Sequence, residues 1–596
     1  FNPKYVTARP ETATDGAYQG IEGVIAHEYF HNWTGNRITC RDWFQLSLKE
    51  GFTVFRDQEF SADMGSRGVK RIEDVRLLRA HQFAEDSGPM AHPVRPDSYM
   101  EINNFYTVTI YEKGAEVVRM QANLLGPELF RKATDLYFER HDGQAVTTDD
   151  FVQCMADASG MELEQFKRWY DYAGTPELSV EGRYDEAGNR FSLKVAQRVP
   201  DTPGQSDKPP FQIPFAVGLL GSNGEDLLQE KTRMLQLTEA EQTFEFGGIA
   251  ENPVPSLLRG LSAPVKVSYD YSDEQLMFLM SHDSDGFSRW DAAQTLAQRM
   301  MLQMVADRRE GRGMEISAGF VDAFRSALVD NSDDKALLAE ILQLPSESYL
   351  GDQMKEVDVE GIFLAREAVR VRLGEVLKED LMMVYELNRE AREYEPVPEA
   401  IGRRRLRNTA LGYLMAATDA DGIEMCLDQY GAHHNMTDVM AALSLVVDSD
   451  VPEREEMLQD FYDSWREDPL VLDKWFSVQA ISRRSDTLDR VKQLMGHEAF
   501  SIKNPNKVRS LIGAFCAGNP MRFHAADGAG YRFLADRVLE LDSMNPQVAA
   551  RMLRIMARWR RYDEGRRELM QQQLQRIVQA DGLSKDSYEI ATKSLD

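Results

Sequence analysis

The chain has 596 residues, of which 43% are apolar and 28% are charged, and its formal net charge is −28. One hydrophobic core does not serve a chain of this length, so several domains are expected. A strongly acidic surface repels nucleic acid and anionic lipid, which argues against either as a partner.

The sequence carries no targeting or membrane-spanning signal. No run approaches the roughly 18–20 apolar residues of a membrane span, and residues 1–4 lack the layout of a signal peptide. Because position 1 is not methionine, we expect the gene to begin upstream of Phe1. The four cysteines lie too far apart in the sequence to suggest a disulfide framework or a zinc motif. We therefore expect a cytoplasmic protein with reduced thiols that does not insert into membranes.

Residues 1–174 are predicted to be mostly helical. Apolar residues at positions 21, 24, 25 and 29 share one face of a helix over 20–31. Further helices are expected over 47–60, 115–125 and 127–140, and Thr147-Thr148-Asp149-Asp150 resembles a helix start with several capping candidates. The stretch 105–111, by contrast, has a β-like composition.

The pattern of apolar and turn residues changes after residue 174 and again after residue 271. Residues 175–271 contain short β-rich segments, at 178–180, 191–195, 213–220 and 243–246, separated by turn residues, which predicts a small β-sandwich. From 272 to 596 amphipathic helices follow one another, which favours an α-solenoid. The predicted fold class is multidomain α+β, with a mostly helical domain at residues 1–174 ahead of the sandwich and the solenoid.

The sequence from His27 to His31, His-Glu-Tyr-Phe-His, matches the H-E-x-x-H pattern. Helical residues four apart face the same way, so both imidazoles can bind one Zn²⁺. Glu28 lies about 100° around the helix, where it can take a proton from water and pass it to a leaving amine. The alternative is a chance match involving ordinary core histidines, which has a probability on the order of 1% for this few histidines.

A catalytic zinc takes a third protein ligand. No histidine follows at the H-x-x-G-x-x-H spacing, so a metzincin is disfavoured. The carboxylate candidates are Glu50, Asp57 and Glu59. Spacing favours Glu50, because residues 32–49 can turn and bring a second helix alongside the first. The alternative is that Glu50 is an ordinary solvated side chain.

The motif from His27 to His31, followed by eighteen residues and Glu50-Gly51-Phe52, resembles the gluzincin zinc aminopeptidases. Bacterial aminopeptidase N-type members of that family have similar sequences at three places, namely residues 40–51, Tyr111-Glu-Lys-Gly114 and residues 504–513. The resemblance runs through essentially the whole chain and implies a thermolysin-like catalytic domain that binds one Zn²⁺. It further implies His27, His31 and Glu50 as zinc ligands, Glu28 as general base, and Tyr111 as hydrogen-bond donor to the oxyanion.

Four further residues are weaker candidates. Asp57 could orient a ligating histidine through its other ring nitrogen. Lys49 could face the leaving-group side of the site or only solvent. Arg509 and Arg551, in the predicted solenoid, could attract the C-terminal carboxylate of a peptide.

The resembled family carries a G-x-M-E-N motif whose glutamate binds the substrate α-amino group, and these 596 residues do not contain it. We expect the motif, and a β-rich domain before it, upstream of Phe1. Residues 1–596 alone are then expected to keep the metal ligands, to be poorly active and to aggregate through exposed core.

The sequence therefore predicts a monomeric zinc aminopeptidase of broad specificity that removes single residues from peptide N-termini in peptide catabolism. A thermolysin-type endopeptidase is the enzymatic alternative, and the sandwich and solenoid that follow the site argue against it. A non-enzymatic helical-repeat protein with a structural zinc is the second alternative. Such a site has no use for Glu28, which argues against it.

Overall fold

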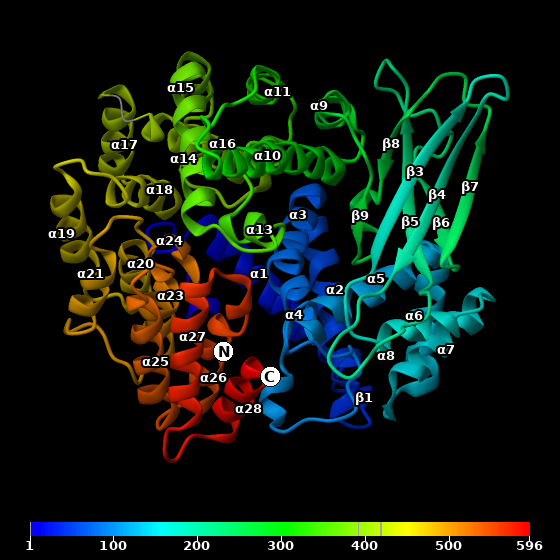
Figure 1. Cartoon of the computed structure of the whole chain (residues 1–596), viewed down its shortest axis with the longest axis horizontal. Coiled ribbons are helices and arrows are strands. Elements are labelled where there is room, and N and C mark those ends of the chain that lie inside the picture. The colour runs from blue at the N-terminus through cyan, green and yellow to red at the C-terminus, as the bar shows by residue number, and fades with distance from the viewer. Residues whose placement is uncertain (1, 391–392, 418–419) are drawn as a thin grey trace. The chain divides into compact units, whose positions relative to one another are not determined.

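The computed structural model describes residues 2–390, 393–417 and 420–596 (Figure 1). The chain divides into two compact units: one is Glu22–Leu296, and the other joins the residues up to Ile21 to Ala297–Asp596. No helix in the described ranges has both the length and the apolar character to span a membrane.

The helices that precede the sandwich carry the residues singled out by the sequence. They are α1 (Asp15–Phe30), α2 (Leu46–Met64), α3 (Arg67–Leu77), α4 (Phe83–Asp86), α5 (Gly114–Leu125), α6 (Pro127–His141), α7 (Thr148–Ser159) and α8 (Arg168–Asp171). The helix start predicted at residues 147–150 is confirmed, and the structure identifies Thr147 as the cap: its side chain accepts from the Asp150 backbone N–H, and the Asp150 carboxylate accepts from the Thr147 N–H. Gly160 (φ 71°) ends α7 in the left-handed conformation that glycine adopts without strain.

The β-like prediction for residues 105–111 is wrong. Ile102–Phe105 form a 3₁₀ turn, and Thr109–Lys113 form a π-helical turn that continues directly into α5. Threonine, valine and isoleucine are typical of strands, but that preference yields to tertiary contacts. Here the Glu85 carboxylate accepts from both the backbone N–H and the hydroxyl of Thr109, at 3.2 and 2.7 Å. This contact fixes the start of the turn.

The sandwich consists of two antiparallel-rich sheets with strand orders β7-β4-β3-β9 and β6-β5-β8 (Figure 1). The strands are β3 (Glu177–Asp185), β4 (Arg190–Arg198), β5 (Ile213–Leu220), β6 (Arg233–Leu237), β7 (Glu241–Gly247), β8 (Val254–Leu257) and β9 (Lys266–Ser268). A separate parallel pair joins β1 (Thr39–Cys40) to β2 (Ala145–Val146). The four predicted strands lie within β3, β4, β5 and β7. Along β5 every residue is buried, because β6 and β8 flank it and both of its faces are covered.

The second unit is built of short helices that pack against their neighbours in the sequence (Figure 1). After α9 (Asp273–His282) of the first unit and α10 (Gly286–Arg309), which crosses the division, these are α11 (Ala318–Leu328), α12 (Lys335–Ile341), α13 (Glu347–Asp352), α14 (Val359–Val376), α15 (Lys378–Leu387), α16 (Pro398–Ala416), α17 (Ala420–Ala432), α18 (Met436–Val447), α19 (Arg454–Trp465), α20 (Pro469–Ala480), α21 (Thr487–Leu494), α22 (Pro505–Val508), α23 (Ala514–Gly518), α24 (Pro520–Phe523), α25 (Ala529–Asp542), α26 (Pro546–Leu553), α27 (Glu564–Val578) and α28 (Lys585–Leu595). Their starts follow from the sequence, because serine, aspartate or asparagine side chains accept backbone N–H groups at Ser317, Asp334, Ser346, Asp358 and Asn435. The predicted multidomain α+β fold, with a sandwich followed by a helical-repeat region, is confirmed.

Candidate metal centre

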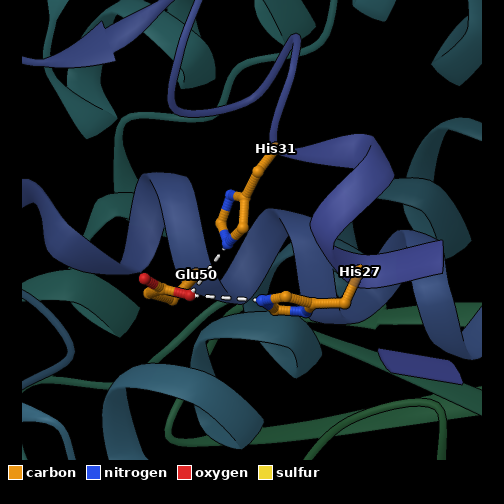
Figure 2. A group of neighbouring side chains, drawn as sticks. All are labelled: His27, His31 and Glu50. Atoms are coloured by element: carbon orange, nitrogen blue, oxygen red, sulfur yellow. Dashed lines mark ion pairs between the residues drawn. The ribbon is translucent and has the colours of Figure 1, made fainter. Parts of the chain in front are cut away.

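Two imidazoles and one carboxylate converge where the end of α1 meets α2 (Figure 2). His27 lies in the last turn of α1, and His31, directly after the helix, remains in helical register because its N–H donates to the His27 carbonyl. The Nε2 atoms of His27 and His31 lie 3.4 and 3.2 Å from Oε2 of Glu50. Among the residues the structure describes, these three form the one group with metal-ligand geometry, with donor atoms within 4.8 Å of one another.

The ring of His27 is fixed from behind by Asp57, which lies two turns after Glu50 on α2. Its Nδ1 atom is 2.7 Å from Oδ2 of Asp57. Burial lowers the pKa of His27, but the hydrogen bonds of Asp57 and Glu50 outweigh this and raise that pKa to about 9. The Asp57 contact therefore leaves Nε2 as the atom that faces Glu50.

The ring of His31 is fixed by the loop that follows α1. Its Nδ1 atom lies 2.9 Å from the Thr34 carbonyl, and the Thr53 hydroxyl is 3.3 Å from the same nitrogen. The hydroxyls of Thr34 and Thr53 are 2.7 Å apart, so α2 and the loop hold this ring together. As with His27, the contact on Nδ1 directs Nε2 toward Glu50.

Glu50 is 4% exposed, and every charged group it touches favours its ionised form. Burial raises its pKa, but the hydrogen bonds of His27, His31 and Lys49 outweigh this and hold the pKa well below its ordinary value. The Lys49 ammonium contacts Oε1, the oxygen turned away from the imidazoles. Glu50 thus directs Oε2 toward the two imidazoles and Oε1 toward the Lys49 ammonium.

The donor set fits zinc. Two imidazole nitrogens and one carboxylate oxygen are a combination found in catalytic zinc sites, which keep a fourth position open. Both Nδ1 atoms are already hydrogen-bonded, so the two Nε2 atoms are the ones that remain to bind an ion. Two such nitrogens aimed at one carboxylate oxygen are complementary to a cation between them.

The predicted general base lies on α1, and the predicted oxyanion donor lies on a turn that packs against α2. Glu28 follows His27 on α1, and its side chain is exposed. Tyr111 lies in the π-helical turn before α5 and is half-buried, with its ring centroid 6.5 Å from that of the exposed Tyr106. Such π-turns are frequent at functional sites.

A partly buried acidic residue, Glu112, follows Tyr111 in the same turn. Burial raises the pKa of Glu112 to about 8, and the charges of Asp74 and Asp57 act in the same direction. Gln58 donates to its Oε2 at 3.4 Å. Glu112 is therefore held in its protonated form at neutral pH.

The remaining sequence candidates are not among the three converging residues. Glu59 pairs with Arg67 and Arg119, both at 2.7 Å or less, and so is not free to act as a third ligand. Arg509, which opens a π-helical turn, and Arg551, on α26, are both exposed in the helical unit. Their role toward a peptide carboxylate stays a prediction.

Four residues that the sequence analysis did not weigh help to build the centre: Thr34, Thr53, Gly51 and Gly114. The threonines support His31, and the glycines are in direct backbone contact. The sequence does place both glycines close to candidate site residues, since Gly51 directly follows Glu50 and Gly114 follows Tyr111 by three residues. Only the pairing of α2 with the turn shows that the two glycines meet.

Three protein-family models match consecutive parts of the chain. Residues 1–170 match the peptidase family M1 domain, residues 174–270 match a domain of unknown function (DUF3458) with an Ig-like fold, and residues 273–596 match its C-terminal companion of ARM repeats. These ranges follow the order of the three predicted domains, whose exact limits stay predictions.

The whole chain is similar to curated proteins and to a solved structure. It is 48% identical to aminopeptidase N of Escherichia coli K12 and 47% identical to that of Caulobacter vibrioides, covering 69% and 68% of those proteins. A crystal structure of Legionella pneumophila aminopeptidase A in complex with aspartic acid matches the whole chain with a TM-score of 0.90 at 32% identity. The match covers 68% of that protein.

Proposed function

The chain belongs to the M1 family of metallo-aminopeptidases, and from that premise we propose that one Zn²⁺ per chain is bound by His27, His31 and Glu50. The observation that carries this proposal is the convergence of their three donor atoms within 4.8 Å. Asp57 and Thr34 support it, because each holds the Nδ1 atom of one imidazole and leaves Nε2 available.

A bound zinc supplies a Lewis acid that polarises a carbonyl and lowers the pKa of water. Glu28, the exposed carboxylate next to His27, takes the proton of the attacking water and delivers it to the amine that leaves. The spacing on α1 supports this role, because a residue one position after a ligand lies beside the ion without binding it. Glu28 thus moves the proton from the nucleophile to the leaving group.

Tyr111 donates its phenol hydrogen bond to the oxygen that gains negative charge as the peptide bond is attacked. A neutral donor that is already aimed stabilises charge that appears only in the transition state. The π-helical turn and the packing of α5 on α2 support this role, because they hold Tyr111 on a rigid element beside the one that carries Glu50.

The substrates are peptides, from which single N-terminal residues are removed, and the protein acts as a monomer in the cytoplasm. The free thiols of Cys40, Cys154, Cys426 and Cys516 support a reducing compartment. A thermolysin-type endopeptidase would share the three ligands. Cleavage of peptides with a free N-terminus, together with resistance of N-acetylated peptides, distinguishes the two activities.

The decisive test separates the ion from the base. In Glu28→Gln, zinc measured by atomic absorption should remain at one per chain, while hydrolysis of an aminoacyl-anilide falls by at least about 10³-fold. General-base and nucleophile-activating roles together support a loss of that size. His31→Ala should lose the zinc itself. Full hydrolysis by Glu28→Gln would refute the assigned base, and full zinc occupancy in His31→Ala would refute the ligand set.

A further inference from the structure

The two oxygens of the Glu50 carboxylate face different partners. Oε2 lies 3.4 and 3.2 Å from the two imidazole Nε2 atoms, and Oε1 bears the Lys49 ammonium. One oxygen therefore belongs to the metal centre, and the other is taken by a cation of the protein.

The contact between Lys49 and Glu50 is not a default result of their adjacency. Consecutive residues on a helix point about 100° apart and do not face each other. Lys49 must fold back to reach Oε1, and that geometry costs side-chain entropy unless the stem is held. The surrounding residues therefore have to leave room for the folded-back lysine stem and limit its freedom.

Gly35 leaves the space that the stem of Lys49 occupies. A β-carbon on Gly35 would lie 2.9 Å from both Cγ and Cδ of Lys49, closer than real β-carbons approach other atoms, and 3.2 Å from Nδ1 of His31. The φ angle of Gly35 is +132°, a conformation that other residues rarely adopt. The loop after α1 thus keeps a channel open for the lysine stem. The side chains of Lys49 and Glu50 are 27% and 5% exposed, so the pair is largely shielded from solvent.

A carboxylate that is free on both sides can bind a metal ion through one or both oxygens. With two imidazoles, a single carboxylate oxygen leaves one position of a four-coordinate zinc for water, and a second carboxylate oxygen bound beside that water raises the ion to five ligands. A charge-assisted hydrogen bond on Oε1 engages the lone pairs that a second bond to the ion needs.

We propose that Lys49 is a positioning residue that restricts Glu50 to a single ligand oxygen and so keeps the ion at four ligands, with water as the fourth. This inference rests on the proposed zinc ligands. It differs from both placements expected from the sequence, since the ammonium serves the ligand itself rather than the leaving group or solvent. It also gives a reason for glycine at position 35.

The test reads coordination rather than turnover. The protein is loaded with Co²⁺, whose visible bands lose intensity when the ion passes from four to five ligands. Lys49→Met keeps the apolar stem and removes the charge, and it should lose band intensity relative to the unaltered protein. Lys49→Arg, which restores a donor to Oε1, should recover that intensity. Arg67→Met, which removes a cation that contacts Glu59 and Asp63 on the same helix, should leave the spectrum unchanged.

The outcomes separate this inference from the proposed function. If the unaltered protein binds no Co²⁺, the ligand set itself is wrong. If it binds Co²⁺ and Lys49→Met gives the same spectrum, the ligands stand and the role of Lys49 is refuted. Loss of bound Co²⁺ from a Lys49→Met variant with an unchanged circular dichroism spectrum would also refute it, because Glu50 is expected to remain a ligand.

Discussion

Gly51 and Gly114 meet backbone to backbone. A β-carbon placed on Gly51 would lie 2.6 Å from the carbonyl carbon of Gly114 and 2.8 Å from its Cα. Glu50 directly precedes the first glycine, and Tyr111 comes three residues before the second. This contact therefore sets the separation between the helix that carries the carboxylate ligand and the turn that carries the phenol.

Gly51→Ala should separate α2 from the turn that holds Tyr111. Because the atoms it meets are backbone, the clash cannot be relieved by a rotamer change, and a displacement of about 1 Å costs up to about 10²-fold in rate. We expect kcat to fall by roughly 10- to 100-fold on an aminoacyl-anilide. Gly20→Ala is the matched control on α1, since an added β-carbon there meets nothing within 4 Å. Unchanged kcat in Gly51→Ala would contradict this account.

Asp57→Asn should weaken metal binding without removing a ligand. The amide can no longer stabilise the His27 ring as the carboxylate does, and loss of such a partner typically costs about 10- to 100-fold in metal affinity. Competition with a chromogenic chelator measures the zinc dissociation constant. Asp63→Asn, whose side chain is 71% exposed on the same helix, should leave that constant unchanged. Equal affinities for both variants would rule out an orienting role for Asp57.

Tyr111→Phe should lower kcat by about 10²- to 10³-fold and leave KM and bound zinc near their original values. The reason is that a hydrogen bond to developing charge acts in the transition state and not in the ground state. Tyr106→Phe, at the exposed tyrosine beside it, is the control and should retain most of the rate. A rise in KM alone would assign Tyr111 to substrate binding instead.

The raised pKa of Glu112 predicts a pH dependence of stability. Its pKa is about 8 in the folded chain and near 4.5 when unfolded, so between these values the folded state binds more protons than the unfolded state. The free energy of unfolding therefore falls as the pH rises from 4.5 to 8, by an amount on the order of 5 kcal/mol, and is then constant.

Glu112→Gln, which cannot ionise, should lack this contribution. Urea unfolding at pH 5 and pH 8 should show the variant gaining stability relative to the unaltered protein at the higher pH. A difference between the two proteins that is the same at both pH values would show that Glu112 does not titrate over this range.

Local spacing carried most of what the sequence could predict about the centre. His27 and His31 lie one turn apart on a helix, so their common direction follows from helix geometry alone. Glu50 is reached through a loop and a second helix, and spacing alone left it beside Asp57 and Glu59 as candidates. The resemblance to the gluzincin aminopeptidases singled it out.

Contacts between distant segments could not be read from the sequence. Strand-like residues around Tyr111 predicted a β conformation, whereas the Glu85 carboxylate and the packing on α2 impose a π-helical turn. Adjacency on a helix gave no reason to bring Lys49 onto Glu50, because the glycine that leaves room for its stem lies fourteen positions earlier. The short strands β6, β8 and β9 escaped notice because too few residues carry their alternation.

The full burial of strand β5 has a consequence for folding and heat denaturation rather than for catalysis. Its eight residues, Ile-Pro-Phe-Ala-Val-Gly-Leu-Leu, carry no charge and meet no water in the native state. In a nascent or heated chain the same segment is exposed to solvent. Uncharged segments with a high β-propensity pair readily with copies of themselves. Heat inactivation of this protein should therefore become irreversible sooner as its concentration rises, because the unfolded chains aggregate before β6 and β8 can cover that strand again.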